Sequence, residues 1–200
     1  MEQFLLGVTN IDHAILVFIQ NYLRFPFLDP VMKFLSFLGE LGWFWIALVL
    51  VLMLFKKTRK AGIVAAISLA IVFCLSWFGI KPLVGRVRPY NDYADLIPLG
   101  YIPTDLSFPS GHTATAFAVV LVLQRMIPNK FSVPLIILAT LISLSRLYNC
   151  VHYPTDVLCG FLLAYVISQL VCFVALRVLK RKKKEKKPGK QKSKEKEARA

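Results

Sequence analysis

The chain has 200 residues, of which 56% are hydrophobic and only 18% charged, and its mean hydropathy is +0.60. This composition leaves too little polar surface to cover a water-soluble globule of this size, so it excludes an ordinary soluble enzyme. The net charge of +14 does not indicate nucleic-acid binding, because 13 of the 25 Lys and Arg residues fall within the C-terminal segment 177–199.

Apolar stretches predict five membrane-spanning helices. A bilayer core about 30 Å thick requires roughly 20 apolar residues per helix. Two charge-free stretches reach this length, at 61–80 and 157–176, and three approach it once flanking residues are included, at 41–55, 106–124 and 131–151. We therefore expect an all-α fold, a polytopic membrane helical bundle.

The first 40 residues carry charges too often for a clear span. Ile15, Phe18, Ile19 and Leu23 recur at helical spacing, which favours amphipathic helices lying in the membrane interface. A sixth span at 11–27 is the alternative, but it would be short and polar. The predicted division of the chain is an N-terminal interfacial segment at 1–40, a transmembrane domain at 41–179 and a basic tail at 180–200.

The distribution of basic residues predicts the orientation. The segments 56–60, 125–130 and 177–199 together carry 19 of the 25 basic residues, so this side is expected to face the cytoplasm. The tail itself has no large apolar residue after Lys180 and is predicted to be disordered. It could bind anionic lipid headgroups or act only as a topology signal.

A set of ionisable residues from three separate segments falls on the opposite, outer face. Its members are Lys81, Arg86, Arg88, His112, Arg146, His152 and Asp156. One such residue at a helix end is commonly an anchor at the membrane surface. The whole set predicts a polyanion site with acid–base groups attached. His13 stands apart from this set and is expected at the interface.

Two local patterns refine this prediction. Ser110, Gly111 and His112 begin an apolar helix, so their backbone N–H groups could point at a bound anion, and Gly111 would permit its close approach. His152 and Asp156 are four residues apart at the start of the last span, a spacing at which a carboxylate can orient an imidazole.

A metal site is the competing interpretation of the same residues. Its ligands would be His112, Cys150, His152 and Asp156. The basic residues of the outer face argue against a bound cation, because they would repel it and could neutralise a phosphate without it. The four cysteines include no C-x-x-C pair and are expected to be small apolar residues. We therefore expect neither a metal nor another cofactor.

The order and spacing of these residues resemble a known family signature. Lys81 precedes Arg88-Pro89 by six intervening residues, Pro109-Ser110-Gly111-His112 follows, and Ser145-Arg146 is separated by five residues from His152 and by three more from Asp156. This pattern resembles the three-part signature of the type 2 phosphatidic acid phosphatase superfamily. That family includes bacterial lipid phosphatases, glucose-6-phosphatase, soluble acid phosphatases and vanadium haloperoxidases. Every signature position is filled.

The resemblance implies a role for each residue. His152 would be the nucleophile that forms a phosphohistidine, Asp156 would orient it, and His112 would protonate the leaving oxygen. The phosphate oxygens would be bound by Lys81, Arg88, Ser110, Gly111 and Arg146. Ser145 is expected to position Arg146. Arg86 lies outside the signature and is expected to contact the interface or the lipid tail.

The resemblance also implies the substrate class. A site among membrane helices suits a lipid phosphate, and the family narrows it to monoesters or diphosphates. Undecaprenyl diphosphate is the first candidate substrate, followed by phosphatidylglycerophosphate and phosphatidate. The protein is expected in a bacterial membrane. A non-enzymatic lipid-phosphate binder or transporter would not need the His/Asp pair, and haloperoxidase chemistry is disfavoured by the spans. The loop 90–106 is either a selectivity element or a plain connection.

Overall fold

The computed structural model describes residues 2–185, and no strand occurs among them. The elements in chain order are α1 (Glu2–Phe18), the π-helix η1 (Ile19–Leu23), α2 (Asp29–Leu38), the 3₁₀-helix η2 (Glu40–Gly42), α3 (Trp43–Leu54), α4 (Arg59–Cys74), the π-helix η3 (Leu75–Ile80), α5 (Lys81–Val84), α6 (Pro89–Asp92), α7 (Gly111–Met126), α8 (Asn129–Tyr148) and α9 (Pro154–Glu185). The predicted all-α class is confirmed.

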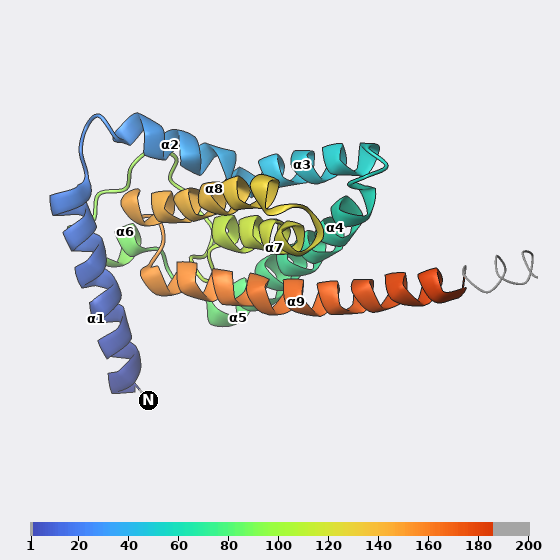
Figure 1. Cartoon of the computed structure of the whole chain (residues 1–200). Helices are drawn as coiled ribbons and strands as arrows, with labels where there is room; N and C mark the ends of the chain where they lie inside the picture. Colours follow the sequence, from blue (N-terminus) through green and yellow to red (C-terminus); the bar gives the residue numbers. More distant parts are fainter. Residues whose placement is uncertain (1, 186–200) are drawn as a thin grey trace, which may run out of the picture.

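Helix α7 forms the centre of the bundle. All of its residues from Gly111 to Leu123 are buried, because α4, α8 and α9 pack around it and α3 packs outside α4 (Figure 1). Several α7 positions are Ala or Thr, and small side chains allow helices to approach closely. The helix thereby carries His112 into the interior at one end of the bundle.

The predicted count of five spans is not confirmed. Three helical stretches are long and apolar enough to cross a membrane, namely Arg59–Asp92, Asn129–Tyr148 and Pro154–Arg181, and a fourth arises if Asp29–Leu38 and Glu40–Leu54 form one span bent by 42°. Helix α7 has only 16 residues, about 24 Å at 1.5 Å per residue, and falls short of a bilayer core of about 30 Å.

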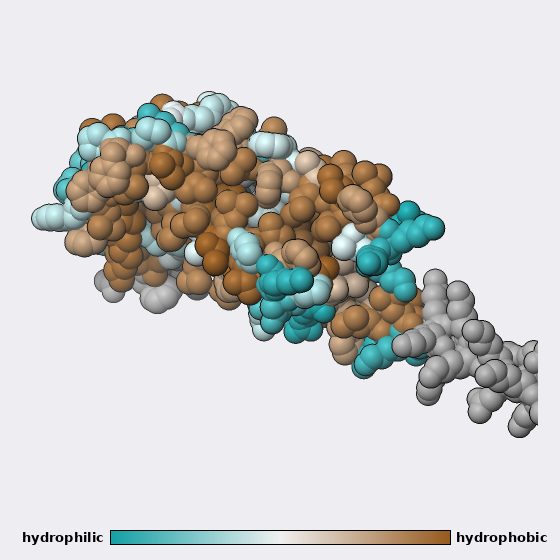
Figure 2. All heavy atoms as spheres, turned by 45° about the horizontal axis from the view of Figure 1, so that its top comes forward, coloured by the Kyte–Doolittle hydropathy of each residue, from teal (hydrophilic) through white to brown (hydrophobic). Residues whose placement is uncertain are grey.

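The outer surface of the bundle is largely apolar, as expected for a protein in contact with lipid. Apolar side chains cover most of the face shown in Figure 2. On α4, Ile63, Ile67 and Ile71 are exposed at intervals of four residues, so they form one apolar stripe along the helix. Such a stripe favours a hydrocarbon surrounding.

The N-terminal helices take two different positions. Helix α1 lies across one end of the bundle, whereas α2 runs beside α8 (Figure 1). On α1, Asp12 and Leu16 are buried, while Ile11 and Ile15 are exposed. Ile15 and Phe18, two residues of the apolar pattern in the sequence, are exposed, and the interfacial location of 1–40 remains a prediction.

The two ends of the bundle differ in composition. The α3–α4 and α7–α8 turns, which hold the basic segments 56–60 and 125–130, lie at the same end as the C-terminus of α9 (Figure 1). Helix α9 continues to Glu185, past the predicted start of the tail at Lys180, because Lys, Arg and Glu are good helix formers. The rest of the predicted tail, 186–200, lies outside the described residues.

Candidate active site

The predicted site residues converge at the end of the bundle opposite the basic turns. A cavity of about 190 Å³ opens there, and its lining includes six of them: Lys81, Arg88, Gly111, His112, Arg146 and His152. Ser110 and Asp156 are buried but do not line the cavity. Six of the eight predicted site residues thus line one cavity, and their roles remain a prediction.

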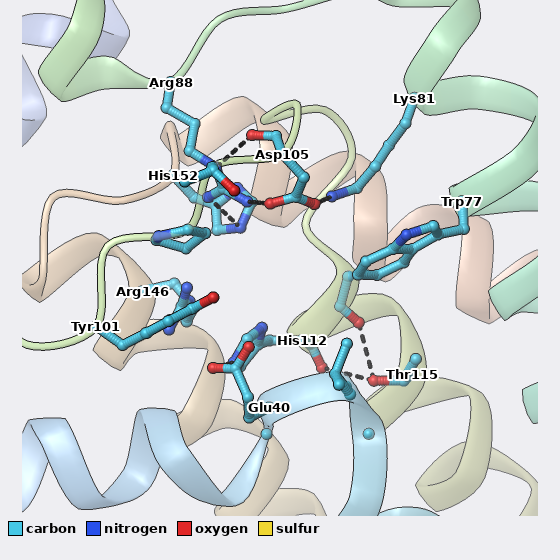
Figure 3. Close-up of a pocket in the computed structure, with 16 residues that line it drawn as sticks. Glu40, Trp77, Lys81, Arg88, Tyr101, Asp105, His112, Thr115, Arg146 and His152 are labelled. Carbon is cyan, nitrogen blue, oxygen red and sulfur yellow. Dashed lines mark hydrogen bonds and ion pairs between the residues drawn. The ribbon is translucent and has the colours of Figure 1, made fainter.

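Lys81 and Arg88 hold a carboxylate that the sequence analysis left without a role in the site. Lys81 donates to the carboxylate of Asp105, and Arg88 Nη2 donates to its Oδ1 over 2.6 Å (Figure 3). The backbone of the same loop is also held, since Arg88 Nε donates to the Asp105 carbonyl over 2.8 Å and Lys81 Nζ to the Leu106 carbonyl over 2.9 Å. Both cations are therefore engaged by one short segment.

Burial and charge oppose each other at Asp105. Burial alone would raise the pKa of its carboxyl group, but the hydrogen bond from Lys81 and the charge of Arg88 outweigh burial and hold the pKa below its ordinary value near 3.8. Asp105 is consequently ionised at any pH near neutrality.

Arg146 presents a different situation on the other wall. It comes from the last turn of α8 and is 1% exposed. Its Nη1 donates to the hydroxyl of Ser36 on α2, but Nε and Nη2 are buried, and none of the described residues 2–185 forms a hydrogen bond with them. Buried donors without a partner cost free energy, so they indicate a ligand with acceptor oxygens.

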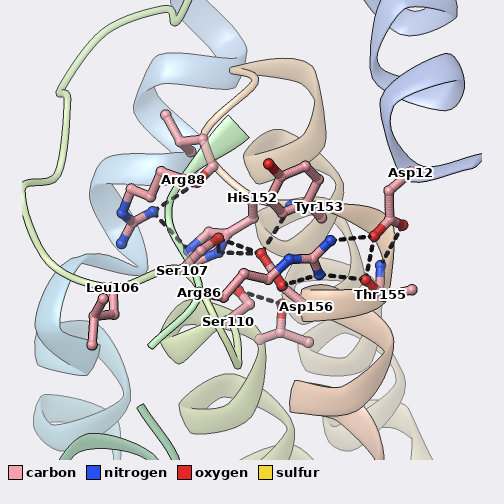
Figure 4. Close-up of polar contacts among 12 residues, drawn as sticks. Asp12, Arg86, Arg88, Leu106, Ser107, Ser110, His152, Tyr153, Thr155 and Asp156 are labelled. Carbon is pink, nitrogen blue, oxygen red and sulfur yellow. Dashed lines mark hydrogen bonds and ion pairs between the residues drawn. The ribbon is translucent and has the colours of Figure 1, made fainter. Parts of the chain in front are cut away.

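His152 and Asp156 form the predicted pair. His152 Nδ1 lies 3.3 Å from Asp156 Oδ2, which also accepts hydrogen bonds from the Ser107 hydroxyl and, over 2.9 Å, from the Tyr153 backbone N–H (Figure 4). A carboxylate at Nδ1 assigns the proton to that nitrogen, which leaves a lone pair on Nε2. Nε2 lies 3.2 Å from Arg88 Nη1 at the cavity.

The surroundings of His152 keep it neutral. Burial, followed by the positive charges of Arg88 and Arg146, holds the pKa of His152 well below its ordinary value near 6.5. A neutral imidazole with a lone pair on Nε2 is the form that acts as a nucleophile, and in this structure that lone pair faces the Arg88 Nη1 donor.

His112 reaches the cavity from the first turn of α7. Its Nε2 lies 3.1 Å from the Ser36 carbonyl and 3.7 Å from Glu40 Oε2, and within the described part of the chain no hydrogen bond engages its Nδ1. Gly39 packs directly on this ring, because a Cβ there would lie 2.5 Å from His112 Cδ2. The histidine is thus fixed by α2 and η2.

The Pro-Ser-Gly-His motif differs from its prediction at Ser110. The Ser110 N–H donates to the Asp156 carbonyl over 3.0 Å and is not available to an anion in the cavity. This bond ties the start of α7 to the start of α9. Gly111 does line the cavity, and a Cβ there would lie 2.8 Å from Trp77, so glycine lets the helix approach the indole.

The interpretation of Arg86 was wrong. Its side chain is 19% exposed and bonds to Asp12 and Asp156, with 2.8 Å in each case, rather than to the interface or a lipid tail. Ser145 also differs from expectation, because its hydroxyl donates to the Ile142 carbonyl over 2.6 Å. His13 stacks on Tyr93 at 3.9 Å between ring centroids and bonds to Asp95.

Several residues of the site were not predicted. The cavity lining also includes Glu40, Trp77, Tyr101, Pro103, Thr104 and Asp105. Four of these belong to the loop 90–106, which therefore does cover the site. Asp105 was expected only as an acidic residue of this loop and not as the partner of Lys81 and Arg88, whereas Glu40 is brought in by the α2–α3 bend, which no local sequence pattern predicts.

The residues proposed as alternative metal ligands do not assemble. Among residues 2–185, no group of three or more His, Cys, Asp or Glu side chains has an arrangement that could hold a metal ion. Cys150 lies instead at Arg24, whose Nη2 is 3.3 Å from its sulfur. All four cysteines are free thiols.

The fold and the cavity define a helical membrane protein with a cavity lined by basic side chains and an oriented histidine. A sequence model of the family described as "PAP2 superfamily" matches residues 59–180, and this chain belongs to that family.

Individual relatives agree with this assignment. An undecaprenyl-diphosphatase of Sulfolobus acidocaldarius is 36% identical over 165 residues, which cover 82% of this chain and 79% of the relative. A lipid A 4'-phosphatase of Bacteroides thetaiotaomicron is 30% identical over 187 residues, which cover 87% and 81%. The solved transmembrane PAP2-type phosphatidylglycerolphosphate phosphatase of Bacillus subtilis has a TM-score of 0.72 and 28% identity over 86% of this chain and 88% of that one. These similarities support a PAP2 membrane lipid phosphatase.

Proposed function

We propose that this protein hydrolyses a lipid diphosphate or phosphate monoester, without a metal, through a phosphohistidine on His152. The observation that carries the proposal is the pair of buried, unpartnered Arg146 nitrogens beside a histidine whose Nδ1 faces a buried carboxylate. The Arg146 nitrogens can bind the oxygens of an anion, and His152 provides a nucleophile at the same cavity.

The residues divide the chemistry among them. Lys81, Arg88 and Arg146 bind the phosphate oxygens, with the backbone of Gly111 beside them, and stabilise the charge of the transition state. His152 Nε2 attacks phosphorus, and the bond from phosphorus to the leaving oxygen breaks. The leaving oxygen takes the electron pair and receives a proton from His112.

Water completes the cycle. A water molecule attacks the phosphorus of the phosphohistidine and gives a proton to His112, while the P–N bond breaks and its electrons return to Nε2. Inorganic phosphate is released, and both histidines regain their starting protonation. Ser110, which the family signature suggests as a phosphate ligand, acts in this scheme by joining α7 to α9.

An apolar groove supports a lipid substrate. It has a volume of about 460 Å³, lies between α3 and α4 and is lined by side chains such as Ile46, Leu69 and Phe73. Leu41 and Thr115 line both this groove and the polar cavity. A lipid whose phosphate occupies the cavity could therefore place its tail in the groove.

The proposal includes the topology. Helices α3, α4, α7, α8 and α9 serve as five spans, with the polar cavity on the extracytoplasmic face and the basic turns in the cytoplasm. Burial of α7 by its neighbours compensates for its short length, because α7 meets protein rather than lipid. This orientation suits recycling of an isoprenoid diphosphate at the outer surface of a bacterial membrane.

Undecaprenyl diphosphate is the preferred substrate. The name of the Sulfolobus relative supports this choice, whereas the Bacillus structure favours phosphatidylglycerophosphate as the second candidate. A binding or transport protein is the remaining alternative, and the His152–Asp156 contact argues against it because simple binding does not require an oriented nucleophile.

The test is phosphate release by the detergent-purified protein in the presence of EDTA. Undecaprenyl diphosphate, phosphatidylglycerophosphate and phosphatidate are compared, and wild type is assayed beside His152→Ala and His13→Ala. We expect release that survives EDTA, disappears in His152→Ala and persists in His13→Ala, since His13 bonds to Asp95 and does not line the cavity. Absence of release from all three lipids by folded wild type would favour the binding protein instead.

A further inference from the structure

Arg86 connects two carboxylates that come from opposite ends of the chain. It follows α5 and reaches Asp156 Oδ1 with Nη1 over 2.8 Å and Asp12 Oδ2 with Nη2 over 2.8 Å. Figure 4 shows the guanidinium lying between the two carboxylates, with Asp12 on α1. Asp156 therefore has a fixed partner on the side away from His152.

Asp12 is itself built into the start of α9. Its side chain is 2% exposed, and it accepts hydrogen bonds from the Thr155 backbone N–H over 3.0 Å and from the Thr155 hydroxyl. Thr155 is the second residue of α9. A carboxylate that accepts from a backbone N–H in the first turn stabilises a helix start, although here it comes from another helix.

An aromatic ring holds the guanidinium from a third direction. Arg86 lies 3.7 Å from the centroid of the Tyr153 ring, and the Tyr153 hydroxyl donates to Asp92 over 2.8 Å. The Tyr153 backbone N–H donates to Asp156 Oδ2. Arg86 thus has little freedom to leave Asp156.

We infer that Arg86 and Asp12 are positioning residues for the phosphotransfer site, and that α1 is a working part of the catalytic centre. They hold the Asp156 carboxylate in the orientation that directs His152 Nε2 into the cavity. Asp12 lies outside the family match at 59–180, so the signature alone assigns it nothing. The inference rests on the proposed role of His152 as the nucleophile.

Other contacts of the N-terminal segment provide the comparison. His13, the next residue on α1, bonds to Asp95 and stacks on Tyr93. Arg24 donates to the carbonyls of Ile97 and Tyr148. These contacts also dock the N-terminal segment, but they do not touch Asp156. Mutations at His13 or Arg24 should therefore weaken the docking of the N-terminal segment without disturbing the orientation of Asp156.

The experiment measures kcat, KM and inhibition by inorganic phosphate with undecaprenyl diphosphate and phosphatidate in detergent micelles. Arg86→Gln is expected to lower kcat about 10²-fold and Asp12→Asn about tenfold, because small errors in placing a reacting group have effects of this size. KM and the half-inhibiting phosphate concentration should stay within about twofold of wild type, since neither residue lines the cavity.

Coupling between the two sites is a second readout. If Asp12 acts through Arg86, the double variant Asp12→Asn/Arg86→Gln should be no slower than Arg86→Gln alone. Arg86→Lys should retain part of kcat, because lysine keeps the positive charge but cannot bond to Asp156 and Asp12 through two separate nitrogens as the guanidinium does. His13→Ala is the docking control and should keep the wild-type kcat even if it lowers the melting temperature.

Three results discriminate the possibilities. If wild type releases phosphate and His152→Ala does not, but Asp12→Asn and Arg86→Gln keep full kcat, the positioning role is wrong and the proposed function stands. The same holds if His13→Ala loses as much kcat as Asp12→Asn. If folded wild type releases no phosphate, the proposed function fails, and this inference fails with it. Should Asp12→Asn not fold, Thr155→Val, which removes the hydroxyl shared by Asp12 and Arg86, is tested against the same criteria.

Discussion

The two walls of the cavity hold their cations in opposite ways. On one wall, Lys81 and Arg88 both donate to Asp105 and to backbone carbonyls of the same loop. On the other wall, Arg146 has a single hydrogen bond, to Ser36, and two buried nitrogens without a partner. A substrate phosphate must compete with Asp105 for the first pair, whereas it meets the donors of Arg146 without a competitor.

The two walls therefore differ in what they contribute: one mainly to folding stability, the other mainly to anion binding. On the Asp105 wall, one carboxylate pairs with two cations and neutralises half of their charge, so this wall should contribute to a stable fold. On the Arg146 wall, the buried guanidinium has no direct ion pair among the described residues, and the carboxylates of Glu40 and Asp105 act on it only from a greater distance. Such a charge is unfavourable for folding and favourable for anion binding. Substitutions on the two walls should therefore have opposite consequences for function.

The largest effect is expected for Arg146→Met. Methionine fills a similar volume but cannot bind phosphate, so kcat/KM should fall by about 10³-fold, as when one transition-state donor is removed. The melting temperature should not fall and could rise, because a buried unpaired charge is replaced by an apolar side chain. Phosphate release and thermal unfolding in the same detergent measure both quantities.

Arg125→Met is the matched control. Arg125 is an exposed arginine in the last turn of α7, at the other end of the bundle, and its replacement should leave kcat/KM unchanged. A fall in melting temperature for Arg146→Met, with little loss of turnover, would mean that Arg146 supports the fold rather than the phosphate.

Asp105→Asn tests the other wall. It should strengthen phosphate binding, whereas Arg146→Met weakens it, and the change should be smaller. Asparagine is nearly isosteric but no longer competes as an anion for Lys81 and Arg88. Inorganic phosphate should inhibit at about fivefold lower concentration, which corresponds to the ~1 kcal/mol of a partly exposed ion pair. KM should fall in the same direction, and kcat should be retained.

Asp95→Asn provides the control within the same loop. Asp95 bonds to His13 and does not line the cavity, so phosphate inhibition should match wild type. A large loss of kcat in Asp105→Asn would instead assign the Asp105 carboxylate a part in the chemistry, and the competition would be the wrong explanation.

The sequence predicted the parts of the site that depend on fixed local spacing. His152 and Asp156 are four residues apart at a helix start, so their proximity follows from helix geometry. Lys81 and Arg88 are only seven residues apart in the sequence, on either side of the non-helical segment 85–87. Their meeting with His112 and Arg146 followed from the expected membrane orientation. The all-α class followed from apolar run length alone.

The sequence could not predict contacts that depend on tertiary packing between distant segments. Asp12 and Asp156 are separated by 144 positions, and only the placement of α1 across the bundle brings both to Arg86. Glu40 reaches His112 because α2 bends into α3, and the Ser110 N–H is taken by the Asp156 carbonyl. The number of spans was hard to predict for a related reason. A helix that its neighbours shield from lipid, such as α7, can be shorter than the bilayer core.

A shift of the pH profile should also distinguish the walls. The groups that face His152 are Lys81, Arg88, Asp105, His112, Arg146 and Asp156. Burial and the cations among them hold the pKa of His152 well below 6.5, and protonation would remove the nucleophilic lone pair. The acidic limb of the pH profile, where His152 becomes protonated, should therefore lie below pH 6.5.

Asp105→Asn should move this acidic limb to still lower pH. The Asp105 carboxylate raises the pKa of His152, so its removal makes protonation harder. The measurement is kcat/KM against pH for wild type and Asp105→Asn at constant ionic strength. An acidic limb at or above pH 6.5 in wild type would contradict the assignment of neutral His152 as the nucleophile.

The smallest effect is expected from removal of residues 186–200, and it tests whether charge or geometry governs the site. The removed segment 186–200 carries seven of the 25 basic residues, yet the Lys and Arg residues of the cavity lie between Lys81 and Arg146, at the opposite end of the bundle from the C-terminus of α9. The truncated protein should keep the wild-type kcat and phosphate inhibition in detergent. It should bind anionic vesicles less tightly, since basic residues near a membrane surface contribute about 1 kcal/mol each. A loss of turnover by correctly inserted, truncated protein would show that basic charge far from the cavity also serves catalysis.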